Sequence, residues 1–150
     1  MKRLRRLRTG ERGTALLETA LTLPLLLIVS VGIFEFGRAY QTWQVLTNAA
    51  REGARLAVLP NPVAGAVTAR VRSYLTSGQL SNAGSASIVV TPNATVPIGG
   101  GATASASLVT VSYPFQFIVL QPVARLLVRG STLGAPFTLT ASAEMRNESQ

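Results

Sequence analysis

The chain has 150 residues and a formal net charge of +8, and it contains no cysteine, histidine or aspartate. Without these residues the chain cannot form Ser-His-Asp or Cys-His catalytic sites, and it lacks the usual nitrogen and sulfur ligands of metal sites. Its single lysine, Lys2, lies at the N-terminus, which also excludes a Ser-Lys site in the rest of the chain. Only carboxylate chemistry stays open, and Glu35, Glu52, Glu144 and Glu148 show no spacing that predicts a facing pair. We therefore expect no enzyme, no catalytic residues, no cofactor, no metal and no small-molecule substrate.

Residues 1–13 form a basic leader, which supplies five of the eight net positive charges. Basic clusters bind nucleic acid in some proteins, but a cluster directly before an apolar run is typical of the end that stays in the cytoplasm. We therefore expect a cytoplasmic N-terminus and no nucleic-acid partner.

An apolar run follows from Ala15 to Phe34, and its twenty residues span about 30 Å as a helix, which matches the hydrocarbon core of a bilayer. Glu35 and Arg38 lie one turn apart just beyond it, and aromatic residues follow as far as Trp43. The sequence thus predicts one membrane span at about 15–36, with the lipid bilayer as a partner.

One carboxylate, Glu18, lies inside this apolar run, where an ionised side chain costs about 2.5–3.5 kcal/mol on insertion scales. If the chain is cut after Gly13, Thr14 becomes the first residue and its amine lies one helical turn from Glu18, so the two can pair. Alternatively, Glu18 lies at the headgroup level and favours the positive end of the helix dipole.

A secretory signal is the rival interpretation of the apolar run, because Ser30-Val31-Gly32 offers a small-x-small cleavage site. The apolar stretch resumes at Ile33, and it is longer than the usual signal core. These two features favour the membrane span.

The helix is expected to cover residues 14–59, because no proline follows Pro24 until Pro60-Asn61-Pro62 stops it. Its outer part carries a stripe of small residues, which permit close approach of another backbone: Ala49, Ala50, Gly53, Ala54 and Ala57. This small-residue stripe packs either on the chain's own C-terminal domain, which we favour, or against the same helix of neighbouring subunits.

Residues 60–150 predict a small extracytoplasmic α+β domain. A second helix is expected over residues 63–77, with one apolar face formed by Val63, Val67, Val71, Tyr74 and Leu75. Strands are expected at 87–91, 103–113 and 137–145, in an antiparallel sheet of about three or four strands against which this helix packs. The fold class is α+β, with a long N-terminal transmembrane helix that continues into the domain.

Two segments of this domain are less regular. In the middle strand the apolar positions change face between Leu108 and Val109, which predicts a bulge or a point where the second face is covered. Residues 115–120 are apolar but too short to span a membrane, so they are expected in the core. Pro122 is then expected to start a short helix with three inward residues, Val123, Leu126 and Leu127.

Four stretches of the first third of the chain, residues 11–21, 23–27, 35–39 and 46–55, read ERGTALLETAL, LPLLL, EFGRA and LTNAAREGAR. They resemble the TadE-like proteins, pilin-like proteins of the tight-adherence (Flp) branch of bacterial type IV pili. The resemblance implies cutting after Gly13 by a prepilin peptidase, methylation of the new Thr14 amine, and use of Glu18 in subunit docking.

The same resemblance implies a minor pilin or pseudopilin that assembles or initiates such a pilus and so supports adhesion and biofilm formation. Its partners would be other pilins and pilus assembly proteins. It would cross the bacterial cytoplasmic (inner) membrane once, N-terminus inside and C-terminal domain outside, before entering an extracellular pilus. The alternative is an uncleaved or conventionally exported envelope protein with a partner-binding outer domain.

Overall fold

The protein is described here by a computed structural model, which covers residues 10–60, 63, 65–127 and 129–147. Most of the basic leader therefore lies outside the described residues. The elements are α1 (Gly10–Ala57), α2 (Ala66–Ser77), a 3-10 turn η1 (Ala83–Ser85), β1 (Ser87–Gly99), β2 (Ala102–Phe115), α3 (Leu120–Leu127) and β3 (Phe137–Arg146). This architecture confirms the expected α+β class.

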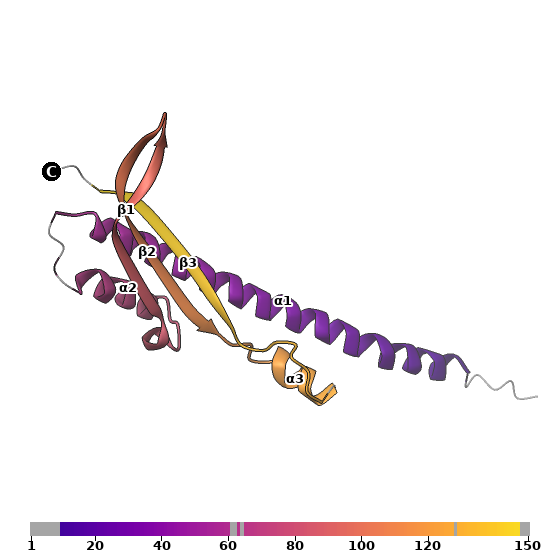
Figure 1. The fold of residues 1–150 in the computed structure, drawn as a ribbon. Coiled ribbons are helices and arrows are strands. Elements are labelled where there is room, and N and C mark those ends of the chain that lie inside the picture. The colour runs from indigo at the N-terminus through magenta and orange to yellow at the C-terminus, as the bar shows by residue number, and fades with distance from the viewer. Residues whose placement is uncertain (1–9, 61–62, 64, 128, 148–150) are drawn as a thin grey trace, which may run out of the picture.

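The two halves of the long helix α1 have different surroundings (Figure 1). Its C-terminal half lies along the sheet, while its N-terminal half projects beyond the domain. The helix begins at Gly10, four residues before the expected Thr14, and ends at Ala57, shortly before Pro60. It continues through Pro24, which shows that one missing backbone hydrogen bond does not interrupt it.

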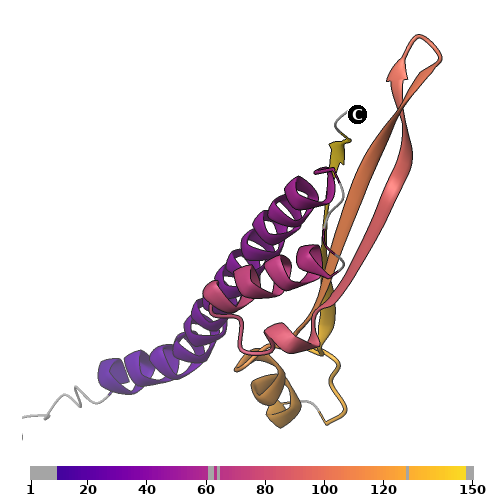
Figure 2. The same cartoon turned by 90° about the vertical axis from the view of Figure 1, so that its left-hand side faces the viewer.

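The domain has two layers, with α1 and α2 on one face of the sheet (Figure 2). The three strands follow one another in the order β1-β2-β3, and both pairs are antiparallel. The opposite face is polar, and hydroxyl pairs cross it from β2 to β3, such as Thr110 to Ser142 at 3.0 Å and Ser112 to Thr140 at 3.2 Å. The sheet therefore has the one apolar face that the alternation of its last strand predicted.

The core lies between the C-terminal half of α1, α2 and the inner face of the sheet. Its fully buried members come from α1, α2 and β2, and they include Leu46, Ala50, Val71, Leu75, Val109, Val111 and Phe115. On α2 the buried residues are Val67, Val71 and Leu75, spaced by four. Val63 precedes the helix and is exposed, and Tyr74 is also on the exposed side, so these two were assigned wrongly to the apolar face.

Of the two origins expected for the irregularity in the middle strand, a bulge in that strand and a covered second face, the structure shows the second. The register of β2 with β3 runs without a break from Ala106 to Phe115, so β2 itself has no bulge there. The extra residue is in β1, between Thr91 and Ala94, where Asn93 has a φ of 56°. Ala106 and Ser107 are both buried although they are consecutive, which shows that both faces of β2 are covered at this point.

Ser107 interrupts the alternation of apolar and polar residues along β2, because a polar side chain here faces the core. Its hydroxyl faces the core, donates to Asn147 Oδ1 at 2.7 Å and lies 3.3 Å from the carbonyl oxygen of Ala57 at the end of α1. The amide of Asn147 in turn donates to Asn93 Oδ1 and Ser105 Oγ, both at 2.9 Å. A polar cluster thus ties the end of α1 to the β1 bulge and to the end of β3, and its inward serine breaks the hydrophobic alternation.

The segment after β2 is only partly core. Phe115 is buried, whereas Ile118 is largely exposed. The helix α3 begins at Leu120, two residues before the expected Pro122, and a proline in the first turn removes no intrahelical hydrogen bond. Val123 is half-buried, and the side chains of the other two expected inward residues, Leu126 and Leu127, are outside the described part.

Candidate functional site

The N-terminal half of α1 is the most exposed apolar surface of the molecule. Every side chain from residue 13 to residue 30 is exposed. An 18-residue window of this helix has the length and composition of a membrane span, and none of it is buried against the rest of the chain. This half of α1 therefore suits membrane anchoring.

The hydroxyl groups within this half are compatible with an apolar surrounding. Thr19 donates to the carbonyl oxygen of Ala15 at 2.8 Å, Thr22 to that of Glu18 at 2.9 Å, and Ser30 to that of Leu26 at 2.8 Å. Each hydroxyl is satisfied within its own helix, so it needs no water or partner helix. The carboxylate of Glu18 is the one formally charged group between residues 13 and 34.

The three residues predicted for processing and docking lie together at the start of this exposed half. Gly13, Thr14 and Glu18 all belong to α1 and are all exposed. A methyl group added at Gly13 would meet no other atom within 4 Å. The peptide bond after Gly13 lies within the helix, so a peptidase that needs an extended substrate must first unwind the first turn of α1.

The small-residue stripe lies on the opposite half of α1 and faces the chain's own domain. Ala49, Ala50 and Ala54 are fully buried, and Ala57 is half-buried against the same core. At Gly53, an added Cβ would lie 2.6 Å from Val71 Cγ2 and 3.1 Å from Val109 Cγ1. The close approach that the stripe permits is therefore made to α2 and β2 within one chain.

A buried ion pair joins the two halves of α1 to the segment before α3. Glu35 is fully buried, and its Oε1 accepts hydrogen bonds from the backbone amides of Ile118 at 2.7 Å and Val119 at 2.6 Å. Its Oε2 accepts from Arg38 Nη2 at 2.9 Å and from Arg38 Nε at 3.3 Å. We call Glu35, Arg38 and the two amides the Glu35 clasp.

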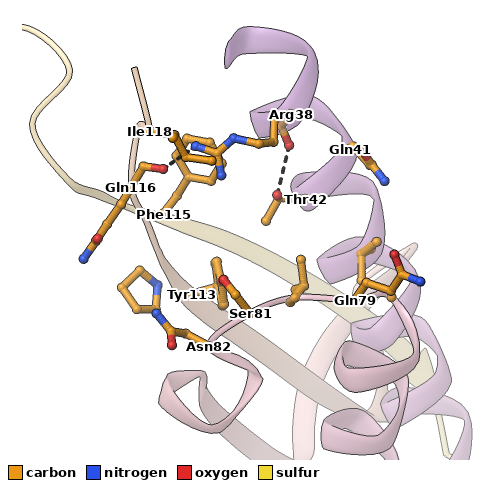
Figure 3. Close-up of a pocket in the computed structure, with 14 residues that line it drawn as sticks. Arg38, Gln41, Thr42, Gln79, Ser81, Asn82, Tyr113, Phe115, Gln116 and Ile118 are labelled. Atoms are coloured by element: carbon orange, nitrogen blue, oxygen red, sulfur yellow. Dashed lines mark hydrogen bonds between the residues drawn. The ribbon is translucent and has the colours of Figure 1, made fainter. Parts of the chain in front are cut away.

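Arg38 completes the clasp from the side of the sheet. Its Nη2 also donates to the carbonyl oxygen of Gln116, and its guanidinium carbon lies 4.4 Å from the centroid of the Phe115 ring. Figure 3 shows Arg38 reaching from α1 toward Gln116, with the Phe115 ring beside it. Both charges are thus matched, and the clasp holds residues 116–119 against one turn of α1.

This role is not evident from the sequence, in which Glu35 and Arg38 mark only the outer end of the predicted span. A signal was present: a glutamate directly next to an apolar run, with an arginine three residues later, needs either water or a partner for its charge. The amides that supply the partner lie 83 and 84 residues away along the chain, and no local pattern marks them.

A pocket of about 280 Å³ adjoins the clasp, between α1, the loop after α2 and the end of β2 (Figure 3). Its walls are as apolar as they are polar, and the polar side chains include Gln41, Thr42, Gln79 and Asn82. Among its described lining residues only Arg38 is charged, and that guanidinium is already bound to Glu35 and Gln116. The pocket therefore offers no free charge for an ionic ligand and no pair of groups for acid–base chemistry.

Of the comparisons with known proteins, one finds a similarity, and it is confined to the long helix α1. Residues 13–55 match the family described as TadE-like protein. The matched region covers the exposed half of α1, the two charged residues of the clasp and most of the small-residue stripe, and it ends before α2. No curated protein and no solved structure matches the chain significantly. Over the long helix that organises its structure, the chain is therefore similar to the TadE-like proteins.

Proposed function

We propose that this protein is a TadE-like minor pilin or pseudopilin that helps to assemble or initiate a tight-adherence (Flp) type IV pilus. The TadE-like match supports the link to the pilus system. In this proposal α1 holds the protein in the bacterial cytoplasmic membrane until its exposed half packs among the helices of other pilins. The protein thereby supports surface adhesion, and its role is structural, not enzymatic.

One observation carries the proposal. A continuous helix of 48 residues is built into a domain by its C-terminal half only, while side chains 13–30 touch none of the core. A helix of this kind can remain in a bilayer or enter a helical bundle without any change in the domain's own packing. This is the property that a subunit needs if it is stored in a membrane and then drawn into a filament.

Glu18 gives this helix a preferred position among its neighbours. Cleavage after Gly13 by a prepilin peptidase would create an amine at Thr14, and the same amine in a neighbouring subunit can pair with Glu18. A buried ion pair adds little net stability, but a shift that leaves either charge unpaired is strongly unfavourable, by about 3–5 kcal/mol. The pair would therefore select one register between neighbouring helices.

The test compares Glu18→Ala with Glu144→Ala, which removes an exposed carboxylate from the outer face of β3. In cells that carry the prepilin peptidase, both variants should insert and should yield a mature chain that starts at Thr14, shown by N-terminal sequencing and intact mass. Glu18→Ala should reduce the number of pili more than tenfold, because the amine of the neighbour loses its partner. Glu144→Ala should leave piliation unchanged.

Two results would contradict this proposal. Normal piliation by Glu18→Ala would remove the docking role of this carboxylate. A mature start at Met1 or at Ile33, whether or not the peptidase is present, would remove the amine itself. The second result would favour an anchored or conventionally exported envelope protein.

A further inference from the structure

The segment from Ile118 to Gly134, which contains α3, occupies an unusual place in the molecule. Both views show α3 at the end of the sheet opposite the β1–β2 hairpin tip and beside the N-terminal half of α1 (Figures 1 and 2). The Glu35 clasp fixes the start of this segment, because Ile118 and Val119 donate their amides to the carboxylate. These hydrogen bonds therefore fix the start of α3 next to the turn of α1 that contains Glu35.

An apolar groove of about 450 Å³ lies between α3 and α1. On the α1 side it is lined by four residues between Pro24 and Val31, and on the other side by Leu120, Val123, Ala124 and Leu133. Its α1 wall lies within the apolar run from Ala15 to Phe34, mostly in the half of that run nearer to the domain. If α1 crosses a bilayer, the groove lies at the depth of the acyl chains of the adjacent leaflet.

The charged residues of the segment that carries α3 are of one sign. Arg125 lies in the last turn of α3 and Arg129 follows the helix, and both are exposed. The sequence has no acidic residue between Glu52 and Glu144, so nothing within this segment neutralises them. Apolar side chains with adjacent arginines are the combination that binds an anionic membrane surface, where the long arginine side chains reach the headgroups.

We propose that residues 118–127 and 129–134 form a second membrane-contacting element, in which the groove holds an acyl chain of a phospholipid and Arg125 and Arg129 bind lipid phosphate groups. The occupant is lipid because the groove continues the exposed apolar surface of α1 and because the segment that forms its other wall carries two exposed arginines and no acidic residue. The element would fix the domain's height and orientation on the membrane, which a single helix cannot do. This inference depends on membrane insertion of α1 and is independent of pilus assembly.

The absence of cysteine makes the test direct, because single cysteines can be introduced and labelled with bimane in the full chain. The probe is Leu133→Cys in the groove, where the native side chain is 61% exposed, and the matched control is Ile98→Cys on the hairpin, 55% exposed. Leu21→Cys reports insertion of α1. The protein is reconstituted in vesicles of phosphatidylcholine and phosphatidylglycerol that contain lipids with brominated acyl chains.

The Leu133 label should be quenched by brominated lipid at least twofold more than the Ile98 label, and iodide in the water should show the reverse order. Phosphatidylglycerol should increase the quenching at Leu133 above that in phosphatidylcholine alone. A variant with Arg125→Gln and Arg129→Gln should lose this increase. Arg51→Gln, which removes an exposed arginine from the domain half of α1, should keep it.

A Leu133 label that is as accessible to iodide as the Ile98 label, while Leu21 is quenched by lipid, would overturn the inference and leave membrane insertion intact. Shielding from both iodide and brominated lipid that disappears when the protein is diluted in lipid would show a second copy in the groove, and would also overturn it. An unquenched Leu21 label would overturn both this inference and the membrane part of the proposed function. An unchanged response of the double arginine variant would overturn the phosphate contacts.

Discussion

Glu35 shows how a carboxylate can be buried next to an apolar helix. It receives four hydrogen bonds, two from Arg38 and two from the amides of Ile118 and Val119. Hydrogen bonds to a charged group contribute about 1.5–3 kcal/mol each, and loss of one partner leaves the other desolvated and unpaired. The contribution of Glu35 is therefore to hold a loop in place.

Replacing Glu35 by alanine should release this loop. The amides of Ile118 and Val119 would lose their acceptor, so their hydrogen exchange should become about 10- to 100-fold faster, as expected for a loss of about 1.5–3 kcal/mol. Glu35→Gln keeps an acceptor but no charge and should show a smaller effect. Hydrogen-exchange mass spectrometry or NMR on the protein in detergent would measure both variants.

Glu52 provides the control at the same scale. It forms ion pairs with Arg70 at 2.8 Å and Arg55 at 3.5 Å, both on the surface. Exposed pairs contribute about 0–1 kcal/mol, so Glu52→Ala should leave the exchange at Ile118 and Val119 unchanged. Equal protection of these amides in wild type and Glu35→Ala would show that packing alone holds the loop.

At the scale of elements, the two halves of α1 differ in how their apolar residues are distributed around the helix. Its N-terminal half is apolar on all sides, which is typical of a helix surrounded by lipid or by other helices. From residue 44 onward the apolar side chains of α1 lie on the side that carries the small-residue stripe, and that side is covered by α2 and β2. Full burial against the domain begins at Glu35, where the clasp begins, and exposed aromatic residues continue as far as Trp43.

Gly53 tests how tightly α1 and α2 approach. In Gly53→Ala the new Cβ would lie 2.6 Å from Val71 Cγ2, so side chains or backbone must move. Overpacking of this kind costs about 1–3 kcal/mol, which exceeds the gain in helix propensity of about 0.5–1 kcal/mol. We expect a lower temperature of thermal unfolding, measured by circular dichroism in detergent.

Gly37 is the matched position. It lies in the same helix, is exposed, and an added Cβ would meet no atom within 4 Å. Gly37→Ala should therefore raise stability by about 0.5–1 kcal/mol through helix propensity alone. If both variants were stabilised alike, the close contact at Gly53 would not exist in solution.

The whole molecule consists of a domain with a projecting helix, and the boundary between them can be located. No side chain from residue 13 to residue 30 belongs to the core, whereas Glu35 and Ala39 are buried. The structure thus predicts that residues 13–31 are dispensable for the folding of the domain. Residues from 35 onward are part of its packing.

Two truncations test this boundary. A chain of residues 32–150 should retain the sheet and the clasp and unfold within a few degrees of the full chain in the same detergent. A chain of residues 41–150 loses Glu35 and Ala39 and should unfold at least about 5 °C lower, since 1 kcal/mol corresponds to about 4–8 °C in a domain of this class. An unfolded 32–150 chain would show that the projecting half supports the domain.

Much of this molecule was accessible from the sequence, because helices, strands and spans repeat over a few neighbouring residues. The long helix, the apolar run with its lone Glu18, and the alternation from Phe137 to Met145 are local periodicities, and the structure has a helix and a strand at these places. The residue inventory also excluded the common catalytic and metal sites without reference to any fold.

Only the tertiary structure decided which surfaces meet. It directed the small-residue stripe toward α2 and β2, converted Glu35 from a boundary marker into the acceptor for two distant amides, placed the bulge in β1 rather than β2, and set α3 beside α1. These contacts join residues that are up to 84 positions apart, and their energies depend on the path of the chain between them. A local sequence pattern predicts whether a segment forms a helix or a strand. Which segments pack together depends on contacts between residues far apart in the sequence, and these form only when the chain folds.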